Sequence, residues 1–193
     1  MKISRNLKII IYIASVLIVV CLVLLLGNHL PILAKGAIMA TAWLPSYLVC
    51  TMVTILSKST YQKKEKNMFG ITAKLYTVLV FLSSSIYTIG VWLITPGSLI
   101  KNIMLGIGLS VQLLLMFYFL FKRINEEPDE RFYRNIAKSS SILFTIAIFI
   151  LLLIATLIAV GGVFVLNAGF LYILVAFLLL LFAITYFITE KRG

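Results

Sequence analysis

Apolar blocks of about twenty residues dominate the chain and constrain its fold more than any other feature. Unpaired backbone N–H and C=O groups are costly in hydrocarbon, so a block of this length is typical of a transmembrane α-helix. The blocks predict an all-α fold class, a polytopic membrane protein with a six-helix transmembrane bundle in one domain over residues 1–193. The predicted helices cover residues 9–26, 36–56, 75–94, 102–121, 141–160 and 170–188.

The first block follows a basic N-terminus and therefore has to be compared with a secretory signal peptide. Its apolar run is longer than the core of a usual signal peptide, and no small-residue cleavage site follows it. Val20, immediately before Cys21, also argues against lipoprotein processing. We therefore expect a retained transmembrane helix.

The distribution of basic residues predicts the orientation. The chain has 17 Lys and Arg against 6 Asp and Glu, a net charge of +11. All the basic residues except Lys35 and Lys101 lie at the two termini or in the loops 57–74 and 122–140. The positive-inside rule therefore predicts that these segments, both termini included, are cytoplasmic, beside the anionic inner leaflet of a bacterial cell membrane. The basic residues flank apolar blocks instead of forming an aromatic-rich basic face, which argues against nucleic acid binding.

The apolar blocks lack the side chains of an ion-driven pump or an intramembrane hydrolase. All six acids lie in predicted cytoplasmic segments, and the single histidine, His29, lies in the first outer connection. Such chemistry needs carboxylates or His at membrane depth, and one His cannot supply a zinc site. Cys21 and Cys50 fall at different predicted depths, too far apart for a disulfide. We expect no enzymatic activity, no cofactor and no metal.

Uncharged polar residues at membrane depth form the first candidate site, which comprises Pro45, Ser46, Ser84, Thr88 and Gln112. Pro45 removes a backbone donor and should kink its helix, and Ser46 is placed to help satisfy the freed carbonyls. Gln112 should face another helix or a cavity, because exposure of its amide to lipid is costly. Interhelical hydrogen bonding and a polar substrate path both fit this pattern.

Small residues also recur at spacings of four, a pattern that lets helix backbones approach closely. The pairs are Gly36 with Ala40, Ala42 with Ser46, Gly106 with Ser110, and Ala155 with Ala159. They fit contacts within the bundle or the seam of a homo-oligomer.

The segment before the fifth predicted helix is the second candidate site, an interfacial anchor or partner-docking loop formed by Asp129, Glu130, Arg131, Arg134 and Lys138. Pro128 suits the first helical position, and the two acids that follow complement the helix dipole. Glu127 with Arg131 and Glu130 with Arg134 have the i, i+4 spacing of helical ion pairs. Phe132 and Ile136 share a face that should lie at the bilayer boundary.

This loop resembles that of a group of uncharacterised multi-pass bacterial membrane proteins that carry Asp-Glu-Arg before a transmembrane helix. The resemblance comprises Asp129-Glu130-Arg131, Ile136 and Lys138, leading into the apolar run from Ile142. It covers about thirty residues, and this chain has Ser139 where Ala is common. The resemblance implies a bacterial membrane protein and indicates no specific activity.

Three functions compete on this basis. The leading prediction is a non-enzymatic accessory, regulatory or immunity-type membrane component that acts through helix packing or a membrane or cytoplasmic protein partner. The alternative is a small transport component or permease with a polar path between the second, third and fourth predicted helices. A lipid-modifying enzyme would need Glu65, Asp129 and Glu130 to form one cluster.

Overall fold

The computed structural model describes residues 31–60, 70–124, 126–161 and 167–192, and within these ranges every regular element is a helix. The helices are α2 (Ile32–Thr60), α3 (Ile71–Ile94), α4 (Leu99–Phe121), α5 (Glu130–Gly161) and α6 (Ala168–Arg192). All five are long and apolar enough to cross a membrane, which confirms the all-helical fold class. The predicted helix at 9–26, with Cys21, lies outside the described residues.

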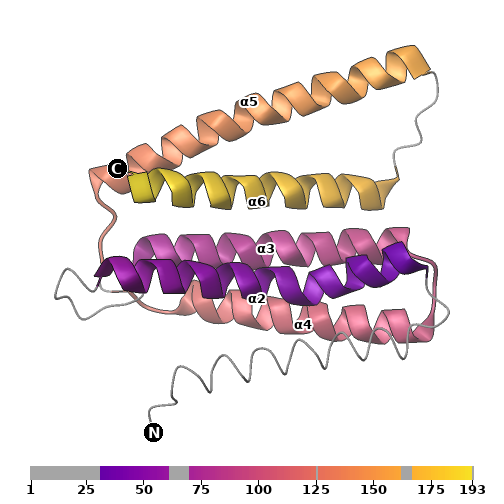
Figure 1. Cartoon of the computed structure of the whole chain (residues 1–193), viewed down its shortest axis with the longest axis horizontal. Coiled ribbons are helices and arrows are strands. Elements are labelled where there is room, and N and C mark those ends of the chain that lie inside the picture. Colours follow the sequence, from indigo (N-terminus) through magenta and orange to yellow (C-terminus); the bar gives the residue numbers. More distant parts are fainter. Residues whose placement is uncertain (1–30, 61–69, 125, 162–166, 193) are drawn as a thin grey trace, which may run out of the picture.

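The five helices alternate in direction, so the bundle has two distinct ends (Figure 1). We call one the basic end, because Lys74, Lys122, Arg131 and Lys191 lie there. Contacts hold its segments together: Lys74 Nζ donates to Lys122 O at 3.0 Å, for example. The opposite end carries the tight connection at residues 95–98 between α3 and α4, and we call it the turn end.

Helix α3 is the centre of the bundle and packs against α2, α4 and α6. At the turn end a core of Ala34, Ile38, Val91 and Leu105 joins α2, α3 and α4. Towards the basic end a second core joins α2, α3 and α6, formed by Met52, Ala73, Tyr76, Val80 and Ala183.

The contact between α3 and α6 is close because two glycines face each other across it. A Cβ added to Gly90 would lie 2.9 Å from Gly169 O, and one added to Gly169 would lie 2.8 Å from Gly90 O. Neither position has room for a side chain, so the absence of Cβ atoms permits this backbone approach.

The helices extend further than the apolar blocks that predicted them. Helix α5 begins at Glu130 instead of Ser141, and α2 covers Ile32–Thr60 instead of 36–56. The predicted loops 57–74 and 122–140 are correspondingly shorter. Hydropathy locates the part of a helix that suits hydrocarbon, whereas backbone hydrogen bonding continues into the polar interface.

Candidate functional site

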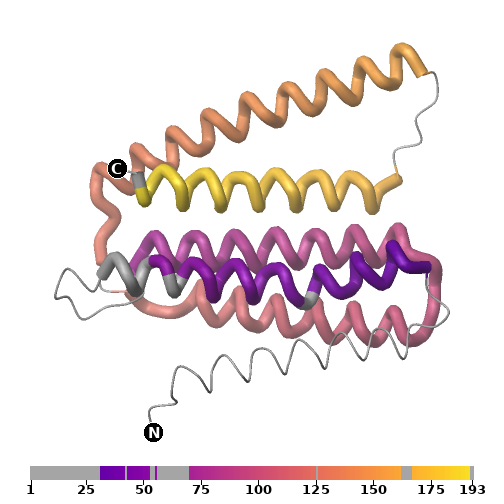
Figure 2. The backbone as a smooth tube through the Cα atoms, in the orientation of Figure 1, coloured from indigo at the N-terminus to yellow at the C-terminus, as the bar shows by residue number. Residues whose placement is uncertain are grey.

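The first candidate site is organised around the carbonyl of Thr41. In a regular helix this carbonyl would accept the N–H of residue 45, but Pro45 has none. Helix α2 bends about midway along its length, where Pro45 lies (Figure 2). Both residues are buried, so the freed carbonyl needs a donor from another helix.

Two neighbouring helices supply donors to this carbonyl. Gln112 Nε2 of α4 donates to Thr41 O at 2.5 Å, and Ser84 Oγ of α3 approaches the same oxygen at 3.4 Å. The other end of the Gln112 amide is also engaged, since Oε1 lies 3.1 Å from Thr88 Oγ1, whose one hydrogen is shared with Ser84 O at 2.8 Å. We call Thr41, Ser84, Thr88 and Gln112 the polar seam. It joins α2, α3 and α4 at the depth of the kink.

The structure therefore brings together four of the five predicted residues, Pro45, Ser84, Thr88 and Gln112. Gln112 and Ser84 share Thr41 O as an acceptor, and Thr88 joins the group through Gln112. Ser46 lies next to Pro45 on α2, whereas the donors to Thr41 O come from α3 and α4. The role of Ser46 stays a prediction. Sequence reasoning missed Thr41, although its position four residues before Pro45 identifies the freed carbonyl. Gln112 is 4% exposed, and both ends of its amide are hydrogen-bonded to protein groups. Its side chain therefore has few free polar atoms with which to bind a substrate.

A buried lysine at the turn end is a further residue that sequence reasoning did not single out. Lys101, placed by the sequence in an outer loop, lies in the first turn of α4 and is only 3% exposed. Its Nζ donates to Trp92 O at 3.2 Å and to Thr95 O at 2.9 Å. These carbonyls belong to the C-terminal end of α3, where a positive charge also complements the helix dipole. Lys101 thus caps α3 from the neighbouring helix.

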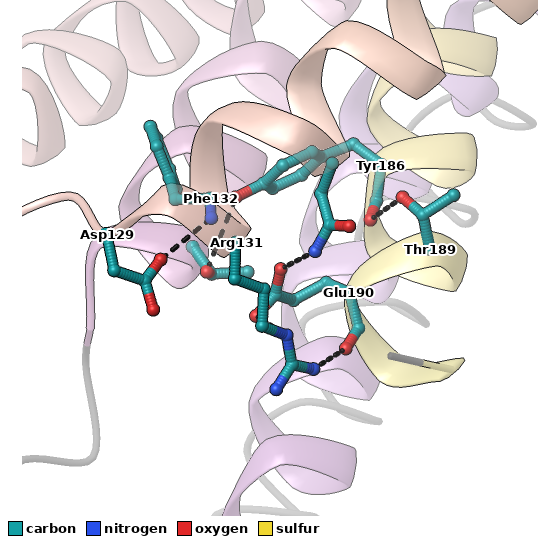
Figure 3. A network of polar contacts seen from close by, with 8 residues as sticks. Asp129, Arg131, Phe132, Tyr186, Thr189 and Glu190 are labelled. Carbon is teal, nitrogen blue, oxygen red and sulfur yellow. Dashed lines mark hydrogen bonds and ion pairs between the residues drawn. The ribbon is translucent and has the colours of Figure 1, made fainter.

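The second candidate site holds α5 against α6 at the basic end (Figure 3). Arg131, Asn135 and Ser139 recur every four residues and so share one face of α5. Arg131 Nη2 donates to Glu190 O at 2.7 Å, and Asn135 Nδ2 donates to Glu190 Oε2 at 2.5 Å. One turn further along, the hydroxyls of Ser139 and Thr189 are 3.1 Å apart. We call these five residues the α5–α6 clamp.

The clamp gives this segment contacts to α6 that the sequence did not predict. Arg131 Nε lies 3.9 Å from Glu190 Oε1, so its ion pair reaches α6 instead of Glu127. Phe132, expected at the bilayer boundary, lies edge-on to Tyr186 of α6 with ring centroids 6.0 Å apart. A local spacing rule cannot detect a partner 59 residues away in the sequence.

The remaining loop residues divide into a helix cap and exposed charges. Asp129 Oδ1 accepts the N–H of Phe132 at 2.7 Å, so Asp129 caps α5. The helix therefore starts after Asp129, and Pro128 does not occupy its first position. Glu130, Arg134 and Lys138 are exposed.

A loop carboxylate also caps the start of α3. Glu126 Oε2 accepts the N–H of Ile71 at 2.7 Å, across 55 residues of sequence. The preceding residue is Gly70, where an added Cβ would lie within 2.4 Å of the same oxygen. Glu126 is thus used for structure, and it ties the connection between α4 and α5 to the N-terminus of α3.

Within the described ranges, no three His, Cys, Asp or Glu residues are grouped so that they could hold a metal ion. His29 and Glu65 lie outside those ranges. No protein-family model, curated protein sequence or solved structure matches this chain.

Proposed function

We propose that this protein is a non-enzymatic component of a bacterial cytoplasmic membrane, of an accessory, regulatory or immunity type, and that it binds a protein partner through α5. One observation carries the proposal: α5 is anchored at one end and leaves the bundle over the rest of its length. Its anchor is the α5–α6 clamp, and from there it diverges from α6 towards the turn end (Figure 1).

The apolar length of α5 contributes no buried residue. Among the described residues, α5 buries only Asn135 and Ser139, both of which belong to the clamp. Phe144, Phe149 and Leu152 are 68%, 66% and 62% exposed. Helices associate in membranes by close side-chain packing and interhelical hydrogen bonds, and α3 has both. A long apolar helix fixed at one end leaves such packing surface available to another transmembrane segment.

We further propose that the chain crosses the membrane six times with both termini in the cytoplasm, and the distribution of charged residues supports this topology. Arg123, Arg134, Lys138 and Lys191 are exposed at the basic end, whereas the buried Lys101 caps a helix at the other. Exposed basic residues favour the side with the anionic leaflet.

Single-cysteine variants at Lys138 and Asn102, in a background without native cysteines, test the orientation with a membrane-impermeant maleimide. Labelling of position 138 from outside intact cells would overturn it.

Photo-crosslinking in growing cells tests the partner role. A benzophenone amino acid replaces Leu152 of α5, and a matched control replaces Tyr47 of α2, which is similarly exposed at 56%. Position 152 should give a discrete protein adduct of higher mass, and position 47 should give none. Equal adducts at both positions, or none at position 152, would contradict the proposal. Turnover of a lipid or peptide by the purified protein would contradict its non-enzymatic part.

The seam geometry is the reason to prefer this function over a transport path. A path requires polar groups free to exchange partners, whereas the Gln112 amide already bridges Thr41 and Thr88. A lipid-modifying site is also less favoured, because Asp129 is occupied as the cap of α5.

A further inference from the structure

Two adjoining cavities form a groove between α2, α3 and α6. No described residue of α5 lines either cavity. The inner cavity, of about 240 Å³, is lined by four residues from each of α2, α3 and α6. The outer cavity, of about 290 Å³, lies towards the turn end and is lined by the same three helices and the turn. Tyr87 and Ile173 line both cavities, so the two adjoin at these side chains.

The groove exists because α2 and α6 both pack on α3 but not extensively on each other. Small side chains keep it open, notably Ala37 and Ala40 on α2 and Ala176 on α6. Its rim is exposed, since Leu44 and Phe177 line the inner cavity and are 48% and 51% exposed. The groove therefore opens at the surface that faces the membrane.

The walls of the groove are mostly apolar, and its lining hydroxyl groups are those of Ser83, Ser84, Tyr87 and Thr95. Three of the four lining hydroxyls donate to backbone carbonyls: Ser83 to Ala176 O at 2.7 Å, Ser84 to Thr41 O at 3.4 Å, and Thr95 to Val91 O at 2.7 Å. A hydroxyl that has already donated its hydrogen adds little polarity to the wall. The groove thus suits hydrocarbon better than a polar solute.

The length of the groove matches one leaflet of a bilayer. It runs along α3 from Val80, near the middle of that helix, to Thr95 at its end. At 1.5 Å per residue this is about 22 Å. Half of a bilayer's hydrocarbon core is about 15 Å thick, and the headgroup region extends beyond it.

The groove is too small to enclose a helix. A helix 10 Å in diameter and as long as the groove fills roughly 1,700 Å³, about three times the two cavities of about 240 and 290 Å³ taken together. An apolar cavity of about 150 Å³ holds a benzene molecule, so these cavities can hold a narrow hydrocarbon chain.

We infer that this groove binds one acyl chain of a phospholipid from the leaflet at the turn end. The chain enters beside the turn, and its methyl end reaches the inner cavity next to the Pro45 kink. This inference requires that the helices span the membrane, but it does not depend on the partner role of α5. The two can therefore fail separately.

Crosslinking with a photoactivatable lipid tests the inference. The full-length protein is reconstituted in vesicles of phosphatidylcholine and phosphatidylglycerol that contain a small fraction of phospholipid with a diazirine at the acyl-chain end. After irradiation, mass spectrometry locates the adducts. Leu48 and Val80, in the inner cavity, should exceed Phe149 of α5 in adduct yield by roughly fivefold, a ratio equivalent to about 1 kcal/mol of preferred binding. Equal yields would overturn the inference.

A filling substitution makes the test specific. Ala40→Phe should reduce the adducts at Leu48 and Val80 to the level of Phe149, while the control Ala155→Phe on α5 should leave them unchanged. If Ala40→Phe does not fold by circular dichroism, Ala37→Leu fills the outer cavity instead. Unchanged adducts in a folded filling variant would overturn the inference. Crosslinks from the groove to another protein segment, with no lipid adducts, would also overturn it.

Discussion

Replacing Gln112 by Met tests whether the polar seam compensates for the N–H that Pro45 lacks. Met has a similar shape but cannot donate to Thr41 O or accept from Thr88 Oγ1. Interhelical hydrogen bonds in membranes average about 0.6 kcal/mol, and an unsatisfied buried acceptor costs about 1–3 kcal/mol. Ser84 remains near Thr41 O, at 3.4 Å. We therefore expect Gln112→Met to lower the free energy of unfolding by about 2 kcal/mol.

A double-mutant cycle with Pro45→Ala separates this mechanism from a general packing effect. The new N–H at position 45 can donate to Thr41 O, so Gln112→Met should then cost less than about 1 kcal/mol. The coupling energy should be about 1 kcal/mol, measured by denaturant titration in detergent with circular dichroism. Ser110→Ala is the matched control on α4, because its hydroxyl bonds only to Gly106 O of its own helix among the described contacts. Additivity within about 0.4 kcal/mol would refute the proposed compensation.

Three further substitutions test individual contacts by thermal unfolding. Gly90→Ala should destabilise the fold by about 1–3 kcal/mol, because its Cβ would lie 2.8 Å from a side chain of α6. Gly108→Ala, with no heavy atom within 4 Å of the added Cβ, should instead stabilise it by about 0.5–1 kcal/mol; equal effects would contradict the close helix approach. Lys101→Met should cost about 1–3 kcal/mol by leaving carbonyls of α3 without their donor, whereas exposed Asn102→Ala should change stability by less than about 0.5 kcal/mol. Glu126→Ala should cost about 1 kcal/mol as the lost cap of α3, and no change would show that the cap is dispensable.

The sequence predicted the positions of the helices and the burial of Gln112, because both depend on whether a group is surrounded by lipid or by protein. Long apolar blocks identified α2 to α6, because satisfying the backbone in hydrocarbon leaves few alternatives to a helix. Gln112 was likewise identified as a residue that must face protein, and the structure buries it. Both inferences depend only on the free-energy cost of placing a polar group in lipid. A single sequence is therefore sufficient to make them.

Contacts between distant segments could not be predicted in the same way. Arg131 has suitable acids within four residues, yet it binds Glu190 because α5 and α6 meet at the basic end. In the sequence Lys101 looks like an ordinary loop residue. Its role as a cap is visible only in the structure, where its Nζ donates to carbonyls at the end of α3. The function and the orientation remain predictions, since they depend on partners and on a membrane outside the chain.

The divergence of α5 from α6 is tested most directly by spin-label distances in the purified protein in nanodiscs. With the native cysteines replaced by Ser, one variant carries labels at Lys138 and Lys191, at the basic end, and another carries labels at Val160 and Ala168, at the turn end. We expect a short, narrow distance distribution for the first pair, and a longer and broader one for the second. Equal, narrow distributions would show that α5 packs along α6, and would contradict the claim that α5 offers its apolar length to a partner.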